Sequence, residues 1–390
     1  MALLYGLTED VTMEILSWLP PKSLIQCKCV SKSWNSFIGS LMENPYFVNK
    51  HLNHMPYTLV FRRSRLFHAY RRFNHDNPLS LLTIFHAGAD HSDRIAFINE
   101  IIDIPRFEGR KEMGSVWLSY HCNGISCMVN SSKTVILCNL ELREFKVVPE
   151  TTYDLCQALI GNKKFNGLKR MGFGYDIRAD VYKIVIIFSW YNNTNKGYTI
   201  CAEVYDLTTN SWKDIKFMEG EAFDINYGWG AENKGVYCKG FYYWLVDSNF
   251  GRRILSFDMC NEVFRILPSL PNTRYKNVEI AVWNDSLALF IWCNNLRKWS
   301  KDPMSIEIWV MEEQSGEWCN VFSIGPFEDM WAPLTFWKRD ELLMVTKDGE
   351  IVSYNLGSKK LRKLDIHPDD RMHCWGFYVK SLVSVNQRRS

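Results

Sequence analysis

Ile254-Leu255-Ser256-Phe257-Asp258 and Glu262-Val263-Phe264-Arg265-Ile266-Leu267-Pro268, separated by a polar turn, form a unit that recurs along this sequence. An apolar run rich in β-branched and aromatic residues, a turn with Asn, Asp or Thr, and a second run that often ends near Pro are typical of two antiparallel strands. The same pattern occurs in residues 135–149, 203–212, 306–321 and 351–364. A sixth, degraded copy ends at Ile104-Pro105.

The spacing of these units predicts the architecture of the larger part of the chain. Successive copies lie roughly 40–65 residues apart, close to the about 40–50 residues of a propeller blade with some inserted loops. Radial repetition of small sheets buries both faces of each sheet and leaves few open edges. We therefore predict a large all-β domain over residues 57–385 that forms a β-propeller of about six blades, with a β-sandwich as the alternative.

The N-terminal residues follow a helical period, so the whole chain is predicted to be an α+β multidomain protein. Over residues 5–52 we expect a small helical domain in which Thr8, Ser31 and Asn44 cap helices and Pro20-Pro21 ends the first one. The first and third helices are each expected to bury one apolar stripe. These stripes are Val11, Ile15, Leu16 and Leu19, and Trp34, Phe37, Ile38 and Leu41.

Composition indicates a globular protein and names no partner. Hydrophobic residues make up 47% and aromatic residues 14% of the 390 residues, enough for a large core. The net charge of +3 is too small to attract nucleic acid or an anionic membrane strongly. The 12 cysteines are scattered singly, which is typical of reduced thiols. The N-terminus lacks the basic segment of a secretory signal, and no apolar run is long enough to span a bilayer, so we expect a cytoplasmic protein with no membrane partner.

No residue pattern points to catalysis, a metal or a cofactor. Gly172-Phe173-Gly174 lacks the third glycine and the following helix of a nucleotide-binding loop. Cys27 with Cys29, His51 with His54, and His121-Cys122 with Cys127 lack the paired clusters of a zinc site. No nucleophile elbow or zinc-protease motif occurs. We therefore expect a protein that is not an enzyme and has no cofactor or metal.

One basic segment leaves an alternative open. Residues 61–73 interleave five arginines with aromatic side chains, a composition that suits RNA through phosphate pairing and base stacking. An edge strand followed by a solvated loop has the same composition, and an acidic protein surface is a further candidate partner. We interpret the segment as an edge strand and loop, and keep an RNA-binding β-propeller protein as an alternative.

Leu7-Thr8-Glu9-Asp10, residues 14–24 and residues 29–34 resemble the F-box, a module that binds the Skp-family adaptor of cullin-based ubiquitin ligases. The sequence departs from the family at Thr8, where the family usually has Pro. A helical hairpin that only caps the β domain would use the same stripe, but it would not need this run of hydrophobic residues with Pro and Lys at these positions. The resemblance implies adaptor binding by Leu7, Asp10, Ile15, Leu16, Leu19, Pro20, Leu24, Val30, Lys32 and Trp34.

The C-terminal region is similar to the F-box-associated domain of plants, in residues 172–185 and 257–264. More narrowly, residues 306–311, 337–345, 348–356 and 378–384 resemble the S-locus F-box proteins, the pollen determinants of self-incompatibility. That resemblance implies a substrate-recognition subunit of a Skp-cullin-F-box ubiquitin ligase, which recruits non-self S-RNase, a toxic ribonuclease of the style, for ubiquitination. An F-box receptor for an unrelated plant substrate is the alternative.

Loops are the expected reader of the substrate, because they can change without unfolding the sheets that they join. Three polar insertions rich in Asn and Lys lie between clear strands. These candidate substrate-binding segments are Asn162 to Arg170, Tyr191 to Tyr198 and Cys293 to Pro303.

Overall fold

The computed structural model describes most of the helices and strands and fewer of the connections. The described residues are 7–55, 57–62, 79–86, 95–102, 116–130, 134–151, 165–192, 197–217, 223–224, 235–248, 251–271, 273, 276–293, 303–337, 340–364 and 373–386. The chain divides into two units, Met1–Pro149 with Asp370–Ser390, and Glu150–Asp369.

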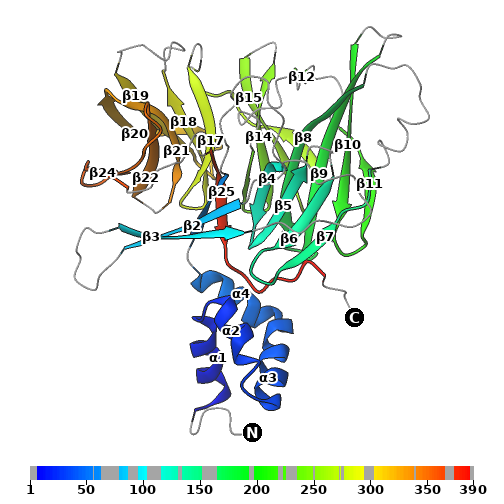
Figure 1. The fold of residues 1–390 in the computed structure, drawn as a ribbon. Helices are drawn as coiled ribbons and strands as arrows, with labels where there is room; N and C mark the ends of the chain where they lie inside the picture. The colour runs from blue at the N-terminus through cyan, green and yellow to red at the C-terminus, as the bar shows by residue number, and fades with distance from the viewer. Residues whose placement is uncertain are drawn as a thin grey trace, which may run out of the picture. The chain divides into compact units, whose positions relative to one another are not determined.

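The N-terminal residues form short helices that begin where the capping residues predict (Figure 1). Thr8, Ser31 and Asn44 each accept a hydrogen bond from a backbone N–H of the helix that follows, at 3.5, 3.2 and 2.9 Å. Pro20 precedes the second helix, whose first residue is Pro21. The predicted helix starts are therefore confirmed. The helices are α1 (Glu9–Ser17), α2 (Pro21–Cys27), α3 (Lys32–Glu43) and α4 (Pro45–His54).

The predicted apolar stripe of α1 is only partly correct. Leu16 is buried, whereas Val11 and Ile15 are exposed. Positions 12 and 16 lie about 100° around the helix from positions 11 and 15, so a helix with apolar residues on two sides can turn only one of them inward. In α3 the prediction holds better, because Ile38 and Leu41 are buried.

The described strands of the first unit form two sheets of four strands each. In one sheet the last strand of the chain pairs with the first, so the spatial order is β25-β1-β2-β3. These strands are β1 (Tyr57–Arg62), β2 (Leu79–His86), β3 (Ile95–Ile102) and β25 (His373–Val379). The second sheet contains β4 (Val116–Cys122), β5 (Ile125–Asn130), β6 (Val135–Asn139) and β7 (Glu144–Val147).

The described strands of the second unit form four antiparallel sheets (Figure 1). The first contains β8 (Phe165–Asp176), β9 (Val181–Asn192), β10 (Gly197–Asp206) and β11 (Ser211–Ile215). The second contains β12 (Phe223–Asp224), β13 (Val236–Cys238), β14 (Phe241–Ser248), β15 (Gly251–Asp258) and β16 (Val263–Ile266). The third contains β17 (Asn277–Trp283), β18 (Ser286–Trp292), β19 (Met304–Met311) and β20 (Trp318–Phe327). The fourth contains β21 (Met330–Phe336), β22 (Glu341–Thr346), β23 (Ile351–Asn355) and β24 (Leu361–Lys363).

The repeated sequence unit corresponds to the same part of each sheet. The five clear copies are the hairpins β6–β7, β10–β11, β15–β16, β19–β20 and β23–β24, which supply the last two strands of five sheets. The prediction of repeated small antiparallel sheets is confirmed. Ile104-Pro105, the end of the degraded copy, lies outside the described residues.

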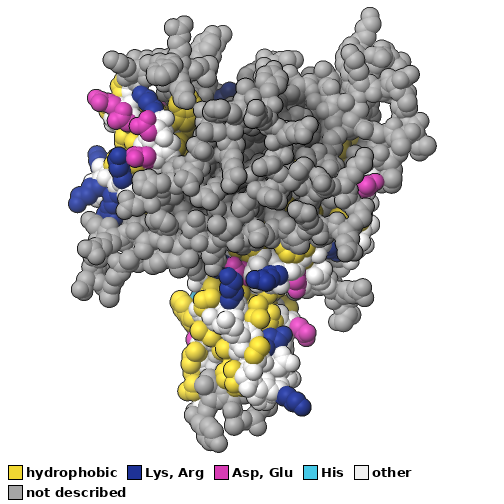
Figure 2. Space-filling model, in the orientation of Figure 1, with side chains coloured by type: hydrophobic (Ala, Val, Ile, Leu, Met, Phe, Trp, Pro, Cys, Tyr) yellow, Lys and Arg dark blue, Asp and Glu magenta, His cyan; other side chains and the backbone are white. Residues whose placement is uncertain are grey.

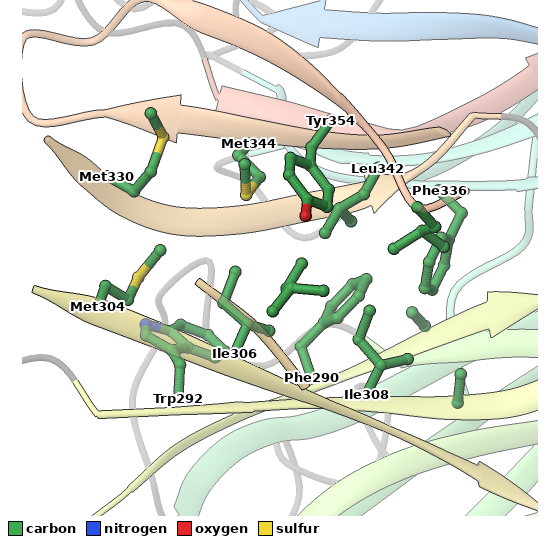
Figure 3. Close-up of a cluster of buried hydrophobic side chains, with 14 of the residues drawn as sticks. Phe290, Trp292, Met304, Ile306, Ile308, Met330, Phe336, Leu342, Met344 and Tyr354 are labelled. Atoms are coloured by element: carbon green, nitrogen blue, oxygen red, sulfur yellow. The ribbon is translucent and has the colours of Figure 1, made fainter. Parts of the chain in front are cut away.

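A large core cluster joins the last two sheets of the second unit (Figure 3). Side chains of β18 and β19 face those of β21, β22 and β23. Phe290 and Phe336 lie with ring centroids 4.9 Å apart, and Phe327 meets Tyr354 edge-on at 5.3 Å. Because both aromatic pairs bridge the two sheets, neither sheet keeps its apolar face covered without the other.

The C-terminal residues are fastened to β6 of the same unit by a buried amide. Asn139 Nδ2 donates to Ser381 O at 2.9 Å and to Val383 O at 2.8 Å, while Asn139 Oδ1 accepts from Glu141 N at 2.9 Å. Both Asn139 and Ser381 are 0% exposed. A single side chain therefore satisfies backbone groups from two distant parts of the chain.

Replacing Asn139 by Ala is expected to destabilise the first unit strongly. Each buried backbone group left without a partner costs about 1–3 kcal/mol, so we expect the free energy of unfolding to fall by at least about 2 kcal/mol. Urea unfolding followed by tryptophan fluorescence measures this change. Asn386→Ala, at an exposed position near the same end of the chain, is the control and should leave the midpoint unchanged. Equal midpoints for both variants would contradict the role of Asn139.

Candidate functional site

An exposed apolar surface runs along α1. Leu7, Val11, Ile15 and Trp18 are 47%, 43%, 45% and 59% exposed. Val11, Ile15 and the C-cap residue Trp18 follow one another at spacings of four and three residues, so they share one side of the helix, and Leu7 lies just before the N-cap residue Thr8. We call these four residues the docking stripe. Figure 2 shows hydrophobic side chains gathered on the helical part of the molecule. Val30, between α2 and α3, is a further exposed apolar residue, at 67%.

A small core supports the helices. Its members come from all four helices and are almost completely buried, which leaves the side chains of the docking stripe outside. They are Leu16, Leu24, Ile38, Leu41, Phe47 and Val48. A stripe of large apolar residues that faces outward from such a core is what a protein-binding surface requires.

The predicted adaptor-binding residues fall into three groups. Exposed ones are Leu7, Asp10, Ile15, Pro20, Val30 and Lys32. Leu19 and Trp34 are half-buried. Leu16 and Leu24 are 3% and 0% exposed, so the structure gives them a supporting role beneath the surface instead of a contact role. The prediction missed Val11 and Trp18 as surface residues; their spacing from Leu7 and Ile15 was the available signal.

Trp18 is held in place by α4. Its ring stacks on His54 with centroids 3.9 Å apart, and its Nε1–H donates to Glu14 Oε1 at 3.0 Å. Glu14 in turn forms an ion pair with Lys50, one turn before His54. The hydrogen bond from Lys50 lowers the pKa of the Glu14 carboxyl. One end of the docking stripe therefore depends on α4 for its orientation.

A buried histidine ties α4 to the end of α1. His51 is 0% exposed, and its Nε2–H donates to Leu19 O at 2.9 Å. Its Nδ1 atom is buried and, within the described part of the chain, meets no hydrogen-bond partner. Burial lowers the pKa of His51, because a charged ring would lose its hydration there. The folded helices therefore hold His51 in its neutral form.

The helical domain is expected to lose stability in mild acid. An unfolded histidine gains a proton as the pH falls through about 6.5, whereas folded His51 resists protonation. The unfolded state then binds more protons, so the free energy of unfolding falls as the pH drops from about 7.5 to about 5.5. Urea unfolding of the full chain, followed by helical circular dichroism, measures this. In His51→Gln, which keeps a donor for Leu19 O, the pH dependence should be smaller; an unchanged pH dependence would contradict the assignment.

Hydrogen bonds between hairpins give the first three sheets of the second unit a common direction. The β8–β9 and β10–β11 turns lie at one end, because β9 pairs antiparallel with both neighbours. Lys183 Nζ, at the start of β9, donates to Met259 O at 2.8 Å, which brings the β15–β16 turn to that end. Met259 N bonds Gly240 O at 2.9 Å, and Cys238 Sγ donates to Asp285 O at 3.3 Å. We call this the turn end, and the opposite one the loop end.

The strand ends that flank the three candidate substrate-binding segments lie at the loop end of the second unit. The first precedes β8, the second joins β9 to β10, and the third joins β18 to β19. Their boundaries need correction, because residues 165–170 belong to β8, and the ends of the second segment belong to β9 and β10. Residues 162–164, 193–196 and 294–302 lie outside the described residues.

Other candidate chemistry finds little support among the described residues. No three His, Cys, Asp or Glu side chains gather there as metal ligands would. Burial raises the pKa of the Cys122, Cys127 and Cys138 thiols, which keeps these sulfurs protonated. No helix in this part of the chain is long and apolar enough to cross a membrane. Of the arginine-rich segment, only the backbone of Phe61 and Arg62, in β1, lies within the described residues.

Comparison with known proteins agrees with both parts of the chain. Residues 79–385 match the family model of the F-box associated beta propeller domain, and residues 4–45 match that of the F-box domain. Similar proteins of Arabidopsis thaliana include F-box protein CPR1, 24% identical over 96% of this chain and 88% of its own length. F-box/WD-40 repeat-containing protein 1 is 25% identical over 95% of this chain and 87% of its own length. F-box/LRR-repeat protein At2g43260 is 25% identical over 96% of this chain and 82% of its own length.

Proposed function

Because this chain belongs to the family of F-box proteins with an F-box-associated β-propeller domain, we propose that it is the substrate-binding subunit of a Skp-cullin-F-box ubiquitin ligase. Such a subunit is not catalytic. It brings the substrate near a charged ubiquitin-conjugating enzyme, and proximity supplies the gain in rate. We propose the cytoplasm as its compartment.

The docking stripe is the observation that carries this function. Four large apolar side chains, each nearly half exposed or more, would be costly to leave in water. Aromatic and aliphatic anchors of this kind dominate protein interfaces when a partner covers them. We assign the stripe, with Val30 and the neighbouring Asp10, Pro20 and Lys32, to the Skp-family adaptor, which in turn binds the cullin.

The stripe can be tested apart from folding. Val11→Asp with Ile15→Asp places charges on exposed positions, so co-purification with the adaptor should be lost while urea unfolding stays close to wild type. Ile177→Asp, which is 74% exposed in the β8–β9 turn, is the matched control and should keep the adaptor. Leu16→Ala should instead lower the free energy of unfolding by about 2–5 kcal/mol. A folded Val11→Asp, Ile15→Asp variant that still binds the adaptor would remove the stripe from the interface.

For the substrate side we propose that the six sheets seen among the described strands are six propeller blades, and that the loop-end segments bind the substrate. Two features support this: the described strand ends that flank the candidate segments share one end of the second unit, and the strands are joined there by more residues than at the turn end. The turn end is made of tight hairpins, several with residues at positive φ, such as Asn210, Glu262 and Asp285. Such turns tolerate little variation.

As the substrate we propose non-self S-RNase, on the resemblance of residues 306–311, 337–345, 348–356 and 378–384 to the S-locus F-box proteins. An unrelated plant protein is the second candidate substrate. RNA binding through residues 61–73 is the alternative function, and binding of labelled RNA to the full chain tests it.

Replacing residues 193–196 and 294–302 with Gly-Ser linkers of equal length is expected to weaken S-RNase binding in vitro about tenfold or more, while adaptor binding is retained. Thr208→Ala with Thr209→Ala, at the turn end, is the control. If the linker variant binds S-RNase like wild type, these segments do not read the substrate. If the wild-type chain itself binds no S-RNase, the substrate is a different one.

A further inference from the structure

β24 is an edge strand, because one of its two sides pairs with no described strand. It is the last strand of its sheet and pairs with β23. Asn355 N bonds Lys360 O at 2.9 Å, and Leu364 N bonds Ile351 O at 3.1 Å, so residues 360 and 364 turn their peptide groups toward β23. By the antiparallel alternation Arg362 does the same, whereas the N–H and C=O groups of Leu361 and Lys363 point away from the sheet.

Positive charge is concentrated along this edge. Four cations occupy five consecutive positions from residue 359 to residue 363: Lys359, Lys360, Arg362 and Lys363. Lys363 is paired with Glu350 at 2.8 Å. Lys359 and Lys360 are exposed, and neither forms an ion pair within the described part of the chain. Figure 2 shows Lys and Arg side chains over this region, at the left of the view where Figure 1 places β24.

An apolar side chain sits among these charges. Leu361 is 44% exposed. Leu361 pairs with Tyr354 of β23, and the side chains of directly paired residues lie on the same face of a sheet. Tyr354 is buried in the cluster of Figure 3, so Leu361 extends the apolar face of that cluster to the exposed edge. The edge thus combines outward peptide groups, one apolar contact and cations on both sides.

Edge strands often carry a lysine that prevents two sheets from pairing with each other. Two other edge strands of this unit carry fewer charges than β24. β16 ends its sheet with one cation, Arg265, beside Val263, which is 44% exposed. β20 ends its sheet with no charged residue along its length. β20 carries Pro326 and pairs with β19 through register shifts, features that also protect an edge, whereas β24 has neither and carries four cations at and just before the strand.

We infer that β24 and the turn before it bind an extended acidic segment of a partner protein, which adds to the sheet as a further strand. The outward groups of Leu361 and Lys363 supply main-chain hydrogen bonds, and Lys359 and Lys360 select acidic side chains. The surface goes beyond the proposed function: it starts at the β23–β24 turn, which is none of the candidate substrate-binding segments, and it does not depend on which protein is the substrate.

The full-length chain and a fluorescein-labelled peptide of alternating Glu and Val test this by fluorescence anisotropy. Wild type should bind this peptide and not one of alternating Lys and Val, and the affinity should fall between about 50 mM and about 300 mM salt. Lys359→Glu with Lys360→Glu should weaken binding about tenfold or more. Leu361→Pro should also weaken it, because proline removes the outward N–H while leaving the charges and the bonds to β23.

The matched control is Lys216→Glu with Arg265→Glu, the same change in net charge at two exposed positions of this unit, one directly after β11 and one in β16. It should alter binding less than about twofold. Equal loss in both double variants would show attraction to net charge alone and overturn the site. The site would also be overturned if the wild type bound phosphatidylserine vesicles but not the peptide. Each variant is checked by urea unfolding and by adaptor co-purification, so failure of the proposed function would be seen separately.

Discussion

The structure depends on the need to cover both faces of every small sheet. All five residues of β6 are buried, and so are six consecutive residues of β18, from Leu287 to Trp292. Successive residues of a strand point to opposite faces, so such a run requires apolar neighbours on both sides. A lone four-stranded sheet of this composition would expose apolar side chains on both of its faces. Repetition of sheets within one domain solves this problem, which is why the β domain is large and its repeats are not independent.

Charge as well as apolar contact joins neighbouring sheets. Lys183, almost completely buried, lies 2.7 Å from Asp176, 2.9 Å from Glu262 and 2.8 Å from Met259 O. Burial alone would raise the pKa of Asp176, but the hydrogen bond from Lys183 and its neighbours lowers it to about 2. Removing one partner would leave a buried charge without a counter-ion. The cluster therefore favours one alignment of the two sheets, although it adds little net stability. The common direction of the turns in this unit follows in part from this cluster.

Sequence reasoning succeeded where a local signal and a global requirement agreed. The capping oxygens of Thr8, Ser31 and Asn44 fix helix starts, and the strand–turn–strand units reappear as hairpins. It failed for residues 165–170, whose Asn, Gly and Lys content is typical of a loop. There β8 keeps its pairing with β9 through two register shifts, so bulges absorb the residues that do not fit a regular strand. Pairing of this kind depends on the partner strand, which local composition does not reveal.

The helical domain shows the same limit. The sequence of α1 indicates a helix with apolar residues on one side or another, but it does not indicate which side faces the core. Helices of seven to twelve residues are too short to be stable alone, so tertiary contacts decide which side faces inward. Here the contacts with α4 decide: His51 holds the end of α1, and the Trp18–His54 stack turns that ring onto the surface. Any partner that covers the docking stripe would bind the folded helices and not the unfolded chain, so it would stabilise them by mass action. Adaptor binding and the stability of these helices are therefore coupled. A substitution that weakens the packing of α4 would lower the affinity for the adaptor, even if the substituted residue does not contact the adaptor.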